Sequence, residues 1–417
     1  MTEQDRRGWI IIGALFVSIA LAYGTVGMTL PALFMTLLHH FRVTRANLSG
    51  LMALQGIAAA ISAPAVGWLL DRVEARLVMA FGAVITGTAL LMASRSGTFF
   101  GLQISYAVMG LGATAAAMVP GPFVAANWFP DERKGFALGC TMLGLSVGGA
   151  VINPLAFLLN IHFGWRACFA LLGLGLIAIM VPLVLLIVRS RPQTLESAAP
   201  GKSPPAAELP GLEVSEGVRG RSLYLIAAIQ FLYTCTLFGT YLHLVPYLMG
   251  QGFAAAVATG VLSIQVFIAG AGKLGMGWMA DRLTGRLTLL VNALINATGY
   301  LLLFGARHYP VLALFVLLYG FTVAAPMALT PMLVIESLGL KRYGSFLGLT
   351  SAMSWIGGAF GPWVTGKIFD MTGSYNDAIL LFIAMQLLIG LAAVGCIPLG
   401  AVVKSPLTAA STSEAVG

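Results

Sequence analysis

The chain has 417 residues, of which 59% are hydrophobic and only 9% are charged, and its formal net charge is +8. Soluble domains carry about 25% charged residues, so this composition excludes a soluble globular protein and indicates a polytopic membrane protein. A net positive charge alone would suit a nucleic-acid-binding protein, but the positions of the charges along the chain give another explanation.

Apolar runs long enough to cross a bilayer recur from one end of the chain to the other. A membrane-spanning helix needs about 20 mainly apolar residues. On this criterion the sequence predicts an all-α membrane protein with twelve transmembrane helices. We place them at residues 9–38, 48–70, 77–94, 99–127, 135–160, 167–189, 222–249, 256–280, 287–305, 309–335, 344–367 and 378–402.

Residues 190–221 have a different composition from the rest of the chain. They contain five prolines, four glycines and charges of both signs. Such a segment predicts a flexible linker. We therefore expect an N-terminal six-helix bundle at 1–189, a linker at 190–221, and a C-terminal six-helix bundle with a short tail at 222–417.

The lysines and arginines predict the orientation in the membrane. If the N-terminus is inside, sixteen of these residues lie on the cytoplasmic side, six lie outside, and Lys273 lies within a helix. Positive residues concentrate on the cytoplasmic side of membrane proteins. We therefore expect both termini and the linker in the cytoplasm, and the basic net charge requires no nucleic acid.

A charged motif occurs twice in the chain, 210 positions apart, each time between two hydrophobic helices. The shared residues are Gly67, Asp71, Arg72 and Arg76 in the first copy and Gly277, Asp281, Arg282 and Arg286 in the second. A second set recurs after 209 positions, from Arg133 and Gly135 to Arg342 and Gly344. Repeats of this kind predict two parallel halves related by an axis along the membrane normal.

The two motif copies resemble the loop signature of the major facilitator superfamily, although Ala75 replaces the usual glycine in the first copy. The resemblance implies a transporter that works by alternating access, with the motifs on the cytoplasmic side between helices 2 and 3 and between helices 8 and 9. It also implies a latch of six residues, in which each aspartate pairs with an arginine or a helix N-terminus in one conformation and releases it in the other. Those residues are Asp71, Arg72, Arg76, Asp281, Arg282 and Arg286. The alternative is that these charges only fix the topology.

Lys273 is the only charged residue well inside a predicted helix. It lies about 12 Å deeper than Asp281, at a rise of about 1.5 Å per residue. Charges at such depth usually face a watery cavity and serve function. All fifteen acidic residues fall in loops, termini or helix ends, so the sequence places no carboxylate at this depth. We therefore predict that Lys273 binds an anionic substrate, the alternative being snorkelling or a structural contact.

Helix 7 carries a polar stripe at helical spacing, formed by Tyr233, Thr236, Thr240, His243 and Tyr247. Lipid does not favour such a stripe, so we expect it to face the protein interior. For His243, contact with substrate or a proton and a hydrogen bond to a neighbouring helix are both open. In this superfamily helices 1, 4, 7 and 10 line the cavity, which implies substrate contacts for Thr240, Tyr23 and Tyr319. The alternative for each single hydroxyl is a hydrogen bond to its own helix.

Three stretches resemble bacterial members of the monocarboxylate transporter and oxalate/formate antiporter branch: 126–135, 241–248 and 272–277. In that branch a helix 8 arginine binds the substrate carboxylate, and Lys273 stands where that arginine is expected. Lysine keeps the charge but lacks the planar fork that holds a carboxylate with two parallel hydrogen bonds. Ala269 stands where mammalian-type members have an aspartate, so the proton route of those members cannot be carried over to this chain.

We therefore expect a secondary active transporter of the bacterial inner membrane that moves a small organic anion, with a monocarboxylate as the expected substrate. Coupling is to protons by symport or to a second anion by antiport. We expect a monomer with no cofactor, no metal and no nucleic-acid partner; the pair His39–His40 has no further ligand nearby. The alternatives are an exporter of drugs or neutral metabolites and, more remotely, a membrane-embedded enzyme or a non-transporting receptor.

Overall fold

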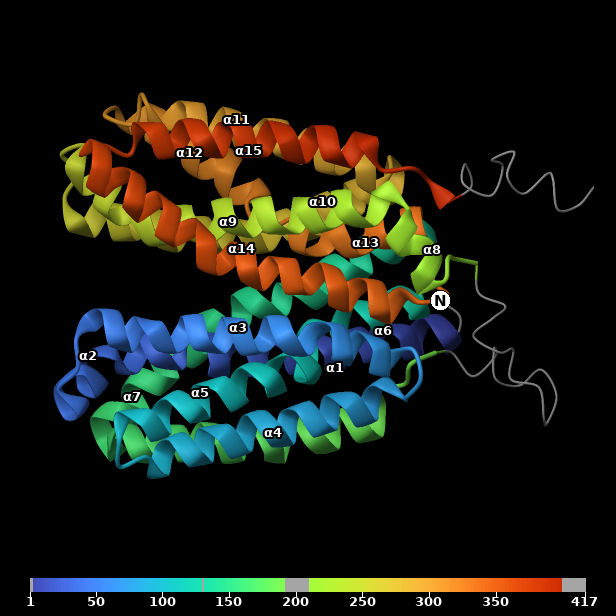
Figure 1. Ribbon diagram of the computed structural model, residues 1–417, viewed down its shortest axis with the longest axis horizontal. Coiled ribbons are helices and arrows are strands. Elements are labelled where there is room, and N and C mark those ends of the chain that lie inside the picture. Colours follow the sequence, from blue (N-terminus) through green and yellow to red (C-terminus); the bar gives the residue numbers. More distant parts are fainter. Residues whose placement is uncertain (1–2, 130, 192–209, 400–417) are drawn as a thin grey trace, which may run out of the picture.

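The computed structural model describes residues 3–129, 131–191 and 210–399, and these residues are almost entirely helical (Figure 1). In chain order the helices are α1 (Glu3–Gly27), α2 (Thr29–Phe41), α3 (Arg45–Leu70), α4 (Ala75–Arg95), α5 (Phe99–Ala113), the π-helix η1 (Thr114–Met118), α6 (Pro120–Trp128), α7 (Asp131–Ile187), α8 (Val214–Arg219), α9 (Arg221–Gly250), α10 (Ala255–Arg282), α11 (Gly285–Leu303), α12 (Tyr309–Thr322), α13 (Pro326–Leu338), α14 (Tyr343–Thr372) and α15 (Asn376–Gly395).

These helices correspond to the twelve predicted spans within the described residues. Ten helical stretches are long and apolar enough to cross a membrane, and one of them, 133–187, consists of two segments that meet at Gly164. Gly164 has φ 80° and ψ 165°, a conformation that glycine adopts more readily than other residues. The loop predicted over 161–166 is therefore a single-residue break. The Gly- and Ser-containing α14 is long enough to cross but is not among the ten.

Prolines divide three of the predicted spans. A proline cannot donate the backbone hydrogen bond to the carbonyl four residues earlier, and its ring clashes with that carbonyl. Pro31 acts on Gly27, where α1 ends, and Pro326 acts on Thr322, where α12 ends. Pro120 follows η1, where the Val119 N–H bonds five residues back to the Thr114 carbonyl, at 3.4 Å. The three predicted helices at 9–38, 99–127 and 309–335 are therefore each interrupted.

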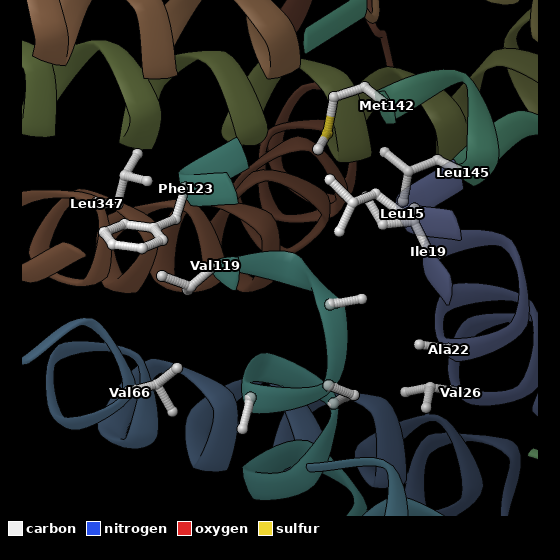
Figure 2. Close-up of a cluster of buried hydrophobic side chains, with 14 of the residues drawn as sticks. Leu15, Ile19, Ala22, Val26, Val66, Val119, Phe123, Met142, Leu145 and Leu347 are labelled. Carbon is white, nitrogen blue, oxygen red and sulfur yellow. The ribbon is translucent and has the colours of Figure 1, made fainter. Parts of the chain in front are cut away.

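The helices form two packed groups that lie one above the other in Figure 1. One group comprises α1 to α7, and the other comprises α9 to α15. The main contacts between the groups are α3 against α14 and α7 against α10. Figure 2 shows part of the buried apolar cluster, which includes Leu347 of α14 together with Phe123 of α6. The apolar core is therefore continuous from one group to the other.

The predicted linker is ordered where the structure describes it. Residues 192–209 lie outside the described residues, but residues 210–219 pack on the connection between α13 and α14. Gly211 forms an antiparallel bridge with Gly339, and the short helix α8 begins at Val214. Glu213 forms salt bridges with Lys341 at 3.2 Å and with Arg342 at 2.8 Å. The hydrogen bond from Arg342 holds the pKa of Glu213 below its ordinary value. This part of the segment is thus not a free linker.

Candidate functional site

The candidate site lies where α7 of the first group crosses α10 of the second. Glycines allow the two helices to touch at backbone level. A Cβ added at Gly135 would overlap the Gly277 carbonyl, and one added at Gly139 would lie 2.5 Å from the Lys273 carbonyl. Because glycine lacks a Cβ, the backbone of Lys273 lies directly on α7.

Lys273 is 2% exposed, and its ammonium donates a hydrogen bond to the Ser146 hydroxyl at 2.8 Å. Side chains of a helix lean toward its N-terminus. This direction carries the Lys273 ammonium from Gly139, where its backbone touches α7, to Ser146, about 10 Å further along α7 at 1.5 Å per residue. Among the described residues no carboxylate forms an ion pair with Lys273. An ammonium has three N–H donors, so this hydrogen bond occupies one of them.

The other crossing, of α3 and α14, has the same backbone geometry without the charge. A Cβ added at Gly348 of α14 would overlap the Ala63 carbonyl of α3. This contact corresponds to the one between Gly139 and the Lys273 carbonyl at the first crossing. Ala63 is the residue 210 positions before Lys273 and is fully buried. Close helix packing therefore does not require a lysine at this position. The charge of Lys273 therefore occurs at one of these two crossings and not at the other. Since helix packing does not explain it, it is a candidate for a functional residue.

Each aspartate of the repeated motif binds backbone N–H groups of a helix in the opposite group. Asp71 accepts hydrogen bonds from the N–H groups of Gly344 at 2.8 Å and Ser345 at 3.0 Å, and from the Ser345 hydroxyl. Asp281 accepts from the N–H groups of Gly135 and Phe136, at 2.5 and 2.8 Å. Gly344 and Ser345 are the second and third residues of α14, where unpaired N–H groups and the helix dipole stabilise a carboxylate, and Gly135 and Phe136 are the fifth and sixth residues of α7. Both bonds cross between the groups, at one end of the molecule that we call the motif end.

The arginines of the motifs do not pair with the aspartates in this conformation, which leaves the helix N-terminus as the observed one of the two predicted partners. Arg72 stacks on Trp68 with 3.8 Å from Cζ to the ring centroid, and Arg282 stacks on Trp278 at 4.8 Å. Arg286 donates to the Cys396 carbonyl at 3.3 Å. Within the described part of the chain, none of Arg72, Arg76, Arg282 and Arg286 forms an ion pair with Asp71 or Asp281. Of the two pairing modes expected for the aspartates, this conformation uses the helix N-terminus, because that pairing joins the two groups.

The polar stripe of α9 faces the interior of its own group of helices. Thr236 accepts from the Gln386 amide, and Tyr247 donates to the Leu303 carbonyl. Thr240 is 2.7 Å from the Tyr300 hydroxyl, which lies 3.3 Å from the Tyr319 hydroxyl. The structure thus joins two predicted substrate contacts, Thr240 and Tyr319, in one buried hydroxyl network. It does not join them to Lys273 by a hydrogen bond among the described residues.

His243 belongs to the same side of α9. Its Nε2 is 3.1 Å from the Pro362 carbonyl, and its Nδ1 is 3.2 Å from the Tyr375 hydroxyl. A carbonyl only accepts, so Nε2 carries the hydrogen, and Nδ1 of the neutral ring accepts from Tyr375. His243 also lines a small cavity of about 30 Å³, which is large enough to hold a water molecule. The structure shows the hydrogen bond to neighbouring helices that was one of the two open explanations.

Tyr23 lies on α1 in the first group and is half-buried. No hydrogen bond between Tyr23 and Lys273, or between Tyr23 and the α9 network, occurs among the described residues. It is 210 positions before Tyr233, whose buried hydroxyl has no hydrogen-bond partner among these residues. The five predicted substrate-binding residues are therefore distributed over four places: Lys273, Tyr23, the hydroxyl network that contains Thr240 and Tyr319, and His243 with its partners Pro362 and Tyr375.

Ser146 was not predicted. In the sequence it stands in Gly144-Leu-Ser-Val-Gly148, which matches a serine-hydrolase motif that has no meaning within a helix. A usable signal was present, since Gly135, Gly139, Met142 and Ser146 follow spacings of four, three and four and share one face of α7. The repeat predicts that this face meets helix 8, and Ser146 is its only polar side chain.

The described residues contain no group of three or more His, Cys, Asp or Glu side chains placed to hold a metal ion. The ring of His40, one of the two adjacent histidines, packs against Trp165 with 5.0 Å between centroids. His39 and His40 therefore form no such group with other described side chains.

Comparison with known proteins decides the family. The family model described as Major Facilitator Superfamily matches residues 15–362. The chain belongs to this superfamily. It is therefore a multi-pass membrane transporter and not an enzyme, and transporters of this superfamily act on small molecules.

Two relatives match over nearly the whole chain. An uncharacterised transporter of the superfamily from Bacillus subtilis, YcxA, is 26% identical, and the match covers 94% of this chain and 95% of YcxA. Monocarboxylate transporter 13 from Bos taurus is 24% identical, over 90% of this chain and 85% of that protein. Among solved structures, the human organic anion transporter MFSD10 has a TM-score of 0.75 at 16% identity, covering 94% of this chain and 100% of that chain. FucP in its outward conformation has a TM-score of 0.72 at 17% identity, with 94% and 99% coverage. These two likenesses support the fold.

Proposed function

We propose that this superfamily member is a secondary active transporter of a small organic anion, with monocarboxylates as the substrate class, and that Lys273 holds the substrate carboxylate. The observation that carries the proposal is the buried ammonium of Lys273, whose one hydrogen-bond partner among the described residues is the neutral hydroxyl of Ser146. The relatives named as monocarboxylate transporters agree with this substrate class.

The energetics favour an anion as the missing partner. Burying an unpaired charge costs several kcal/mol even after the protein relaxes. An anion at Lys273 would offset that cost and form charge-assisted hydrogen bonds, which are about twice as strong as neutral ones. Ser146 could then turn its own hydrogen toward the anion while still accepting from the ammonium, because a hydroxyl is both donor and acceptor.

The two crossings suggest how access alternates. The structure is closed at the motif end, where Asp71 and Asp281 each bind a helix of the opposite group. We propose that this end faces the cytoplasm, as the positive charges predict. The two six-helix bundles, 1–189 and 222–417, would rock about Lys273 and Ser146, so that the substrate site opens to one side at a time. Movement is coupled to protons or to exchange of a second anion.

Transport by reconstituted vesicles tests the assignment. Purified protein would be placed in liposomes, and uptake measured for labelled monocarboxylates, dicarboxylates and a neutral sugar. We expect saturable uptake of a monocarboxylate by the wild type. Lys273→Ala and Lys273→Gln should reduce it to background, whereas Lys273→Arg should keep substantial uptake because it preserves the charge.

Ligand-induced thermal stabilisation separates a lost site from a lost fold. A ligand that binds the folded state raises its stability as its concentration rises. The carboxylate should stabilise the wild type and Lys273→Arg but not Lys273→Gln, with Lys367→Gln on α14 as the matched control that behaves as wild type. If Lys273→Ala transports and is stabilised like the wild type, the anion site is wrong and an exporter of drugs or neutral metabolites takes its place.

A further inference from the structure

Each group of helices carries an arginine stacked on a tryptophan at the motif end. Arg72 covers Trp68 and Arg282 covers Trp278, and the two pairs are 210 positions apart. Both arginines are exposed, and the tryptophans are 50% and 52% exposed. The same geometry therefore occurs twice, on surfaces related by the internal repeat.

Both tryptophans continue exposed apolar stripes. On α3 the stripe contains Ile57 and Ile61 before Trp68, and on α10 it contains Ile264 and Phe267 before Trp278. Exposed apolar side chains on a membrane protein contact lipid tails, and tryptophan concentrates at the interface between tails and headgroups. One turn beyond each tryptophan, Arg72 and Arg282 then lie at the level of the lipid phosphates.

Neither guanidinium has another partner among the described residues, where no hydrogen bond or ion pair is formed by Arg72 or Arg282. The N–H groups around each guanidinium edge are therefore free while its face rests on the indole. A different stack in this chain shows the contrast. Arg166 lies 4.2 Å over Trp165, but that tryptophan is 6% exposed and Arg166 donates to the Ser96 carbonyl at 3.3 Å. Arg166 serves the packing of the protein, whereas Arg72 and Arg282 present free donors to the surroundings.

We propose that the Trp68–Arg72 and Trp278–Arg282 pairs are two equivalent binding sites for the phosphate of an anionic phospholipid. The indole fixes the guanidinium plane, so little side-chain freedom is lost when its fork binds the phosphate oxygens. The exposed stripe beside each tryptophan receives the acyl chains. Because the binding face lies next to Asp71 and Asp281, a lipid bound there also adjoins both contacts that close the motif end.

Lipid titration of the delipidated, full-length protein tests the proposal without any transport measurement. Phosphatidylglycerol would be added to detergent-purified protein, and the number of retained lipids counted by native mass spectrometry. We expect two retained molecules on the wild type and one on Arg72→Gln or Arg282→Gln. The double variant should retain none, with affinity at each altered site falling about fivefold or more, as expected for one basic residue near a charged surface. Arg95→Gln, at the opposite end of α4, is the matched control and should retain two.

Two further arms distinguish the source of the phosphate and the role of the ring. Glycerol phosphate at the same concentration should not compete, since it lacks the acyl chains; full competition would show a site for a soluble anion and overturn the proposal. Trp68→Leu and Trp278→Leu should each lose one lipid while keeping the arginine. If the double arginine variant is folded and retains two phosphatidylglycerol molecules, the pairs are not lipid sites.

Discussion

At the scale of single residues, the informative pair is Lys273 and Ser146. Among the described residues, the Ser146 hydroxyl is the one hydrogen-bond partner of the Lys273 ammonium. In the proposed complex with an anionic substrate, the ammonium would gain a second and stronger partner. The hydroxyl should therefore stabilise mainly the substrate-free transporter. In net transport the substrate-free transporter has to change conformation in every cycle, whereas in exchange it does not.

We predict that Ser146→Ala slows net transport more than exchange. Leaving a buried donor without its partner costs about 1–3 kcal/mol, so the return of the empty protein should slow on the order of tenfold. Exchange between labelled and unlabelled substrate needs no empty return and should change little. Counterflow and net uptake into the same liposomes measure the two modes. The control is Ser263→Ala on α10, whose exposed hydroxyl bonds only its own helix. An equal loss in both modes would contradict this role for Ser146.

At the scale of helices, closure at the motif end depends on two aspartates that bind helix N-termini. Burial raises the pKa of the Asp71 carboxyl, and the hydrogen bonds from Ser345 and Gly344 partly oppose this rise. These bonds offset the cost of burying a charge only while the two groups touch. In the proposed rocking motion, the aspartates would therefore stabilise the conformation closed at the motif end and not the conformation open there.

We predict that Asp281→Asn lowers the maximal transport rate more than substrate affinity. Asparagine keeps one acceptor oxygen and presents an NH₂ group to the second backbone N–H. Loss of a cap costs about 1 kcal/mol, which shifts a two-state balance several-fold while leaving the substrate site intact. Initial-rate kinetics in liposomes give both parameters, with Asp377→Asn, in the first turn of α15, as a control that should behave as wild type. An affinity loss at unchanged maximal rate would instead place Asp281 in substrate binding.

The sequence predicted the helices and their repeat because both depend on local pattern. It did not predict which neighbour each polar face meets. The spacing from Tyr233 to Tyr247 correctly placed a polar face inside the protein, but only packing shows that it faces α11, α14 and α15. Ser146 was missed because it is a single hydroxyl on a face of small and apolar residues, and its spacing to Gly135 and Gly139 has meaning only once the helix packed against that face is known. Most partners of Asp71 and Asp281 are backbone N–H groups, which every residue type except proline offers, and the Ser345 hydroxyl is the one side-chain partner among the described residues.

At the scale of the whole molecule, two groups of helices meet through two equivalent crossings, of which only α7–α10 carries a charge. Closure therefore has a symmetric part, supplied by glycines and aspartates, and an asymmetric part, supplied by Lys273. The glycines and aspartates, present at both crossings, are suited to the proposed rocking of the two groups. Lys273, present at one crossing, is suited to making that motion depend on the substrate. This division of roles needs a fixed orientation in the membrane, which the positive charges predict.

We predict that the motif end is cytoplasmic. In a cysteine-free background, a single cysteine at Ser203, in the segment outside the described residues, should be protected from an impermeant thiol reagent in intact cells. One at Asn47, exposed near the start of α3 at the opposite end, should be labelled. Permeabilised cells supply the control in which both react. Labelling of Ser203→Cys but not of Asn47→Cys in intact cells would reverse the orientation.

The bonds from Asp71 and Asp281 to main-chain N–H groups also have a consequence for how substitutions spread through related sequences. A carboxylate that recognises a peptide group imposes no choice of side chain on that partner, so apart from the Ser345 hydroxyl no compensating pair of substitutions can record these contacts. The constraint falls instead on the absence of a side chain, at Gly135 and Gly344, where an added Cβ would strike the facing backbone. Methods that infer contacts from correlated changes should therefore detect both closures poorly, while a saturation scan should find these glycines intolerant of substitution.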